Sequence, residues 1–133
     1  MSELAHEVTR ALRTGGSLVV SFVDIDGLKA VNDFAGHAAG DEVIRNLGQV
    51  LKASLRSYDL IVRYGGDEFL CAVSDASIND VEMRLVEATS ALAALPRAAS
   101  FTAGLAELRP GDTVEDLIAR ADANLYARRR RGA

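Results

Sequence analysis

The sequence predicts an α/β sandwich of the α+β class, in which helices pack on a mainly antiparallel central sheet. Apolar residues recur at helical spacing in five segments, and four shorter segments are rich in valine, isoleucine and other apolar residues. Two of these strand-like segments are separated by Gly65 and Gly66. A Gly-Gly link predicts a tight hairpin, because such turns need the positive φ that glycine adopts freely. Two β–helix–β segments around this hairpin give a sheet covered by helices.

The first half of the chain predicts three helices and a buried strand. Residues 2–13 have helical spacing, which a pair of glycines then ends. Residues 17–23 form a nearly unbroken apolar run, typical of a strand buried on both faces. A short helix is expected over 29–35 and a longer amphipathic helix over 41–55.

The second half predicts the hairpin, one further strand and two further helices. The hairpin strands are expected over 59–64 and 67–74. A capping box at 77–80 opens a helix that continues until Pro96, where proline ends the pattern. The remaining predicted elements are a strand over 98–108 and a helix that opens at 113–116.

Composition limits the class of protein. The 133 residues are enough for one domain, predicted over 1–133, with 1–16 as a short N-terminal helix and turn. The net charge of −4 argues against a nucleic-acid binder. No apolar stretch approaches the ~20 residues that span a bilayer, so no membrane segment is expected. The single cysteine, Cys71, lies in an apolar run and is expected to be a core residue in a cytoplasmic protein.

Three carboxylates are expected to meet at one rim of the sheet. Asp24 follows the buried first strand, and Asp67 and Glu68 open the strand after the glycine turn. If these strands pair antiparallel, the end of one lies beside the start of the other. Such hard oxygen ligands suit Mg²⁺ or Mn²⁺ and phosphoryl chemistry. The alternative is a solvated loop beside an ordinary exposed hairpin.

Polar groups suited to a nucleotide lie close to these acids in the sequence. The amide of Asn32 and the carboxylate of Asp41 could read the donor and acceptor edge of guanine, although both could instead cap helices. Lys29 and the arginines at 128–131 could offset phosphate charge. The arginine run could equally be a solvated helix end.

Residues 24–33, 36–41 and 65–69 together resemble the GGDEF domain, the diguanylate cyclase family, with a match from about residue 17 to 133. The resemblance implies a palm-like fold with a ferredoxin-like core. It also implies a metal-dependent reaction that condenses two GTP into cyclic di-GMP and releases two pyrophosphates. Each protomer would hold one GTP, so catalysis would need a homodimer.

The same resemblance implies roles for individual residues. Asp67 and Glu68 would be catalytic, with Asp67 helping to deprotonate the attacking 3′-hydroxyl. The metal ligands would be Asp24, Asp67, Glu68 and the backbone carbonyl of Ile25. The substrate-binding residues would be Asn32 and Asp41 at guanine, Leu28 beside them, Gly65 and Gly66 where the phosphates approach, and Lys29 and Arg129 at the terminal phosphates.

Residues 56–59 resemble the family's RxxD inhibitory site, in which Arg56 and Asp59 would bind product cyclic di-GMP. The alternative is a surface ion pair at a helix end. The chain also departs from the family pattern. Its N-terminal Asp-x-Leu-Thr-Gly-Leu signature is missing, Leu28 replaces a common phenylalanine, and the final arginine of the C-terminal signature is absent. These departures leave open a catalytically silent GGDEF domain that acts as a receptor for cyclic di-GMP or GTP.

Overall fold

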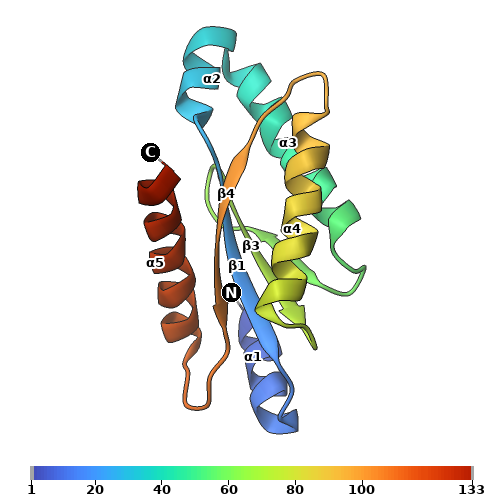
Figure 1. Ribbon diagram of the computed structural model, residues 1–133, viewed down its shortest axis with the longest axis vertical. Coiled ribbons are helices and arrows are strands. Elements are labelled where there is room, and N and C mark those ends of the chain that lie inside the picture. Colours follow the sequence, from blue (N-terminus) through green and yellow to red (C-terminus); the bar gives the residue numbers. More distant parts are fainter. Residues whose placement is uncertain (1, 133) are drawn as a thin grey trace.

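Nine elements follow one another in the order predicted from the sequence, in a computed structural model that describes residues 2–132 (Figure 1). They are α1 (Ser2–Thr14), β1 (Leu18–Ile25), α2 (Leu28–Ala35), α3 (His37–Ser54), β2 (Leu60–Arg63), β3 (Glu68–Ser74), α4 (Ile78–Ala93), β4 (Phe101–Glu107) and α5 (Val114–Gly132). None of these helices has both the length and the apolar character needed to cross a bilayer.

The element boundaries differ most from expectation at α3, which begins at His37 and not at Asp41. Gly36, with φ 88°, makes the break between α2 and α3 by itself. Because one left-handed glycine is enough to turn the chain, residues 37–40 are free to start the next helix. Asp41 therefore lies within a helix.

The sheet has the strand order β2-β3-β1-β4, and every neighbouring pair is antiparallel. The predicted α+β class is confirmed, and the first strand pairs with the second strand of the hairpin as expected. In that pairing Asp24 lies directly opposite Glu68. The carboxyl end of β1 and the start of β3 thus meet at one end of the sheet.

β1 is buried on both faces because helices cover both sides of the sheet (Figure 1). Its Val19 and Val23 side chains join a core with α3 and α4, whereas Val20 and Phe22 join a core with α1 and α5. Cys71 in β3 belongs to the first core, and burial raises the pKa of its thiol to about 12. The thiol is protonated at neutral pH, in keeping with the predicted role as a small core residue.

α5 packs directly against the backbone of β4 at Gly104. A Cβ atom there would lie 2.2 Å from the carbonyl oxygen of Ala121 and 2.3 Å from the backbone nitrogen of Leu125. The Asn124 Oδ1 atom accepts a hydrogen bond of 2.9 Å from the backbone N–H of Leu105. These contacts fix how far α5 lies along the sheet, and so where its C-terminal arginines lie.

We expect Gly104→Ala to destabilise the protein and to displace α5, because the new methyl group meets backbone atoms that cannot rotate away. The loss should be about 2 kcal/mol or more, as for other overpacked cores. Urea unfolding followed by circular dichroism measures it. Gly132→Ala is the matched control, since a Cβ there meets nothing within 4 Å. Equal stability of the two variants would contradict the close packing at Gly104.

Candidate active site

Three carboxylates converge where β1 ends and β3 begins. Asp24, Asp67 and Glu68 each offer one oxygen, and these oxygens all lie within 4.8 Å of one another. The backbone supports the arrangement, because the Ile25 N–H donates a 3.4 Å hydrogen bond to the Asp67 carbonyl. The structure therefore brings together the three acids that the sequence analysis placed at one rim.

Burial makes negative charge on this cluster unfavourable. It raises the pKa of Asp24 despite the opposing effect of Arg129, and the charge of Asp67 acts in the same direction. Burial likewise raises the pKa of Glu68, with further contributions from Asp24 and Asp67. One oxygen of the cluster, Asp24 Oδ1, is buried without a hydrogen-bond partner among the described residues. An orphaned carboxylate oxygen beside two further acids fits a hard divalent cation.

Arg129 supplies positive charge at the same place from α5. Its Nη1 atom donates a 2.7 Å hydrogen bond to Asp24 Oδ2, and its Nη2 atom lies 2.8 Å from Asp26 Oδ1. Nη2 also donates to the backbone carbonyls of Asp24 and Ile25, at 3.2 and 3.3 Å. One guanidinium thus bonds two of the groups predicted to bind metal, the Asp24 carboxylate and the Ile25 backbone carbonyl.

Asp26 anchors Arg129 and is itself held by Thr102 of β4 and by Ser100, which directly precedes β4. Its carboxylate accepts hydrogen bonds from the hydroxyls of Ser100, at 2.8 Å, and Thr102, at 2.7 Å. Although burial acts against it, these bonds and the bonds from Arg129 hold the pKa of Asp26 below its ordinary value. Asp26 remains charged and keeps the guanidinium in place.

The hairpin differs from the predicted two-residue turn. Residues 64–67 form a loop between β2 and β3, in which the Tyr64 and Gly65 N–H groups both donate to the Glu68 carbonyl, at 2.8 and 3.4 Å. Neither Gly65 nor Gly66 has a positive φ, so the argument from left-handed backbone was wrong here. A Cβ added at Gly66 would meet nothing within 4 Å. What the glycines provide is a loop surface without side chains next to the acids.

The predicted guanine-binding residues lie on α2 and α3, directly beyond the end of β1 (Figure 1). The Asn32 side chain packs over Gly40, where an added Cβ would lie 1.8 Å from Asn32 Oδ1. Asn32 is therefore brought next to Asp41 in the following helix. Neither side chain caps a helix, since Gly36 occupies the N-cap of α3, and the capping alternative is wrong. Leu28 packs against the first core, and Lys29 is exposed.

A family model described as "Diguanylate cyclase, GGDEF domain" matches residues 1–133. The chain belongs to the GGDEF family. The match includes the first sixteen residues, which lay outside the motifs that carry the resemblance.

Similar proteins agree with this GGDEF assignment. Diguanylate cyclase DosC of Escherichia coli K12 is 38% identical over 136 residues, which cover 96% of this chain and 29% of DosC. Diguanylate cyclase DgcP of Pseudomonas aeruginosa is 34% identical, covering 97% of this chain and 20% of DgcP. The chain therefore spans less than a third of these curated relatives.

Solved GGDEF structures share the fold. The GGDEF domain of DgcB from Caulobacter crescentus, in complex with c-di-GMP, superposes with a TM-score of 0.92 at 30% identity, covering 98% of this chain and 82% of that one. The active GGEEF domain of a diguanylate cyclase from Vibrio cholerae gives a TM-score of 0.89 at 26% identity, covering 98% and 90%. The palm-like α+β fold is thereby confirmed.

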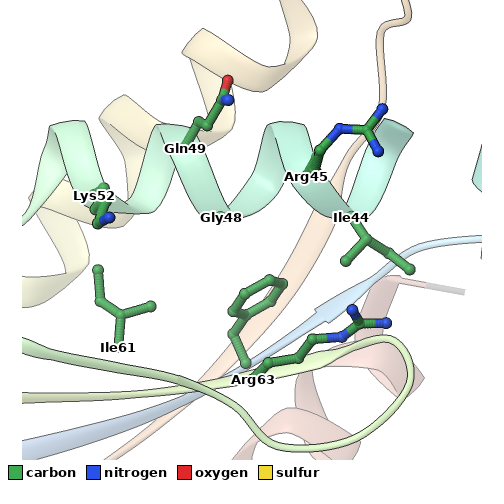
Figure 2. A pocket seen from close by; sticks show the side chains of 8 residues that line it. Ile44, Arg45, Gly48, Gln49, Lys52, Ile61 and Arg63 are labelled. Carbon is green, nitrogen blue, oxygen red and sulfur yellow. The ribbon is translucent and has the colours of Figure 1, made fainter. Parts of the chain in front are cut away.

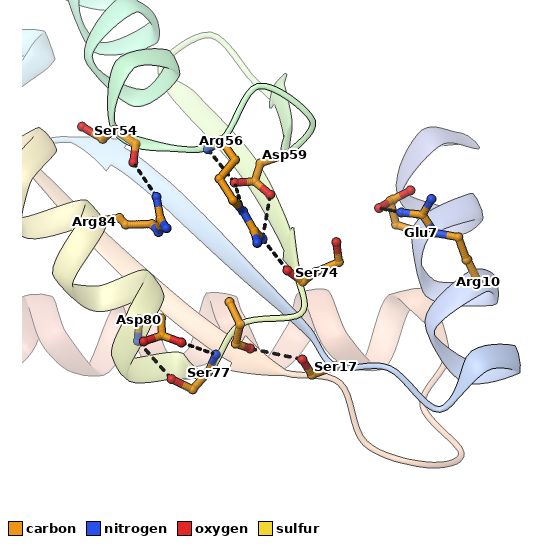
Figure 3. Close-up of polar contacts among 11 residues, drawn as sticks. Glu7, Arg10, Ser17, Ser54, Arg56, Asp59, Ser74, Ser77, Asp80 and Arg84 are labelled. Carbon is orange, nitrogen blue, oxygen red and sulfur yellow. Dashed lines mark hydrogen bonds and ion pairs between the residues drawn. The ribbon is translucent and has the colours of Figure 1, made fainter.

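The RxxD residues of this GGDEF domain, Arg56 and Asp59, bond to each other, and Arg56 also bonds to the end of β3 (Figure 3). Asp59 accepts hydrogen bonds from the Arg56 backbone, at 2.7 Å, and from its guanidinium, at 3.1 and 3.2 Å. Arg56 also donates to the Ser74 carbonyl at the end of β3. Because the Asp59 side chain is fully buried, the alternative of an ordinary surface ion pair does not describe it.

The sequence analysis missed Asp122 and Tyr126 of α5 as site residues. Together with Asp24, Glu68 and Arg129 they line a hollow of about 450 Å³. The charge of Asp122 adds to the effects that raise the pKa of Glu68. The spacing of 122, 126 and 129 places them on one helical face, which could have linked them to Arg129.

We expect Glu68→Gln to stabilise the metal-free domain at neutral pH. The folded-state pKa of Glu68 is raised, so its charged form disfavours folding above the ordinary carboxyl pKa. The variant's gain in free energy of unfolding over wild type should therefore grow as the pH rises from about 4. Below that pH the gain should vanish. Thermal unfolding in EDTA across this range measures it, with the exposed Glu87→Gln as the control for loss of one charge. A wild type more stable than the variant at pH 7 would contradict the electrostatic argument.

Proposed function

We propose that this GGDEF domain is a diguanylate cyclase, which condenses two GTP into cyclic di-GMP and releases two pyrophosphates. The observation that carries the proposal is the convergence of Asp24, Asp67 and Glu68 around an orphaned carboxylate oxygen. The relatives named diguanylate cyclases, which match over nearly the whole chain, support it.

Mg²⁺ or Mn²⁺ is the cofactor that this donor set suits. Asp24, Asp67, Glu68 and the Ile25 carbonyl would hold it, and their oxygen atoms are the ligands that both ions prefer. When bound, the ion would offset triphosphate charge and stabilise charge that develops in phosphoryl transfer.

The proposed reaction joins two nucleotides held in two half-sites. Asp67 would accept the proton of a 3′-hydroxyl, whose oxygen then bonds to the α-phosphorus of the other GTP as pyrophosphate leaves. The 3′-hydroxyl of that second nucleotide then attacks the α-phosphorus of the first, the second pyrophosphate leaves and the ring closes, so one GTP per protomer and a homodimer are required. Asn32 and Asp41 would hold guanine beside Leu28, the bare loop at Gly65 and Gly66 would admit the phosphates, and Lys29 and Arg129 would contact the terminal phosphates.

Product feedback is proposed through Arg56 and Asp59. The DgcB structure in complex with c-di-GMP supports a product site in this family. Since Arg56 is already bonded to Asp59 and Ser74, product binding there would also act on the end of β3. The proposed location is the cytoplasm, because one buried cysteine suits a reducing compartment.

A catalytically silent receptor is the second candidate function. The observation in its favour is that Arg129 covers the Ile25 carbonyl and one oxygen of Asp24, groups that the metal would need. In the cyclase, Arg129 must give up these contacts when the metal and nucleotide arrive.

The test is to incubate the protein with GTP and Mg²⁺ over a wide range of protein concentration and to separate the products. We expect cyclic di-GMP and two pyrophosphates per molecule, a rate that rises faster than protein concentration, and no product from Glu68→Gln. In the same assay, added cyclic di-GMP should slow the wild type and not Arg56→Ala. Binding of cyclic di-GMP without any synthesis would instead identify the receptor.

We expect Arg129→Ala to bind Mn²⁺ more tightly than wild type when no nucleotide is present. Removing the guanidinium frees Asp24 Oδ2 and the Ile25 carbonyl and removes a like charge beside the ion, which should raise affinity by about tenfold. Electron paramagnetic resonance of free Mn²⁺ measures this directly. Arg131→Ala removes an exposed charge from the same helix and is the control. Weaker Mn²⁺ binding by a folded Arg129→Ala would show that Arg129 does not compete with the ion.

A further inference from the structure

A second hollow lies away from the acids, between α3 and the edge strand β2 (Figure 2). It has a volume of about 350 Å³. Ile44, Ile61 and the ring of Phe69 form its apolar part. The Gly48 backbone lies close to that ring, since an added Cβ would be in ordinary van der Waals contact with it, 3.5 Å from the ring atoms Cε2 and Cζ.

Three cations surround this apolar surface. Arg45 and Lys52 line it from α3 at opposite ends and Arg63 lines it from β2, and Gln49 is the other polar side chain among the described lining residues (Figure 2). No acid lines it, and none of the three cations forms an ion pair within residues 2–132. Elsewhere in that part of the chain, six arginines are paired (Arg10, Arg56, Arg97, Arg120, Arg128 and Arg129) and six cations are not (Arg13, Lys29, Arg84, Arg109, Arg130 and Arg131). Uncompensated positive charge thus gathers here on a protein whose net charge is −4.

We propose that this hollow binds a small aromatic anion of the mononucleotide class. Its volume suits a small molecule, whereas a stable protein partner would need roughly 800 Å² of surface on each side. A planar ring can lie against Ile61 and the part of the Phe69 ring that borders the hollow, beside Gly48, from which no side chain projects. The phosphate would lie at the end of the hollow with Arg45 and Arg63, where arginine can bond it through two N–H groups, and Lys52 would add positive charge from the other end.

The hollow is joined to the acidic site through the hairpin loop. Arg63 Nη2 donates a 2.7 Å hydrogen bond to the Gly66 carbonyl, and Phe69 directly follows Glu68. An anion that draws the Arg63 guanidinium into the hollow removes this bond from the loop. Ligand binding and the setting of residues 64–67 are therefore linked, and the linkage is reciprocal. None of the lining residues belongs to the proposed GTP, metal or RxxD sites, so the binding itself does not depend on the proposed function.

The test is a titration of the ¹⁵N-labelled 133-residue chain with AMP, in EDTA and without GTP. AMP is the probe because adenine lacks the N1–H and N2–H donors proposed to meet Asp41. We expect saturable amide shifts centred on Gly48, Ile61 and Phe69. Adenosine and inorganic phosphate should each bind at least about tenfold more weakly, because each lacks half of the required contacts. Phosphate that binds as tightly as AMP would overturn the proposal.

Two variants test the location. Gly48→Leu fills the hollow in the interior of α3, where leucine also favours the helix, and should abolish the shifts. Arg45→Glu combined with Lys52→Glu reverses two exposed charges and should weaken AMP binding by about tenfold or more. Arg13→Glu, on the opposite face of the sheet, is the charge control and should leave affinity unchanged. Binding that survives Gly48→Leu, or that falls equally with Arg13→Glu, would show no site in this hollow.

Discussion

The antiparallel pairing of β1 with β3 is the constraint on which the rest of the site depends. It sets Asp24 opposite Glu68 at the end of two strands whose other residues are almost all buried. Carboxylates in such a place are unfavourable unless positive charge or donors accompany them. The Arg129 guanidinium meets that need for one oxygen of Asp24 and leaves the other without a partner. The site is therefore only half neutralised by the protein itself, which leaves a defined place for a cation.

The position of Arg129 depends in turn on the packing of α5 against Gly104. A helix that touches strand backbone at Ala121 and Leu125 cannot slide or rotate without a clash. Arg129 lies one turn further on, so a contact made without any side chain at Gly104 decides where the charge reaches the sheet end. Asp26, held by Ser100 and Thr102 of the β4 segment, fixes the guanidinium from the other side. Packing and electrostatics act on the same residue.

The fold and the acidic cluster could be predicted from the sequence because both follow from local patterns. Apolar periodicity identified all nine elements, and the two most apolar strands were expected to be neighbours, which brought Asp24 to Glu68. Contacts that depend on where a helix packs could not be predicted from the sequence. No local pattern indicates that Arg129 meets Asp24, or that Asp59 is buried beneath Arg56. The glycine argument failed for a different reason. A four-residue loop needs no left-handed backbone, so Gly-Gly did not define the turn type.

The hairpin loop at residues 64–67 lies between two charged groups of residues. On the side of α5 lie the acids and Arg129, and on the side of α3 lies Arg63, which bonds the Gly66 carbonyl. The position of this loop is set by backbone hydrogen bonds of Tyr64 and Gly65 to Glu68 and of Ile25 to Asp67, by packing of the Tyr64 ring on Phe22 and by that one arginine contact. Because the arginine contact involves a charged side chain, a charge placed in the hollow would act on the loop through it. In the proposed reaction the glycines would leave room for a phosphate, and in the proposed second site Arg63 would link the loop to the charge bound in the hollow.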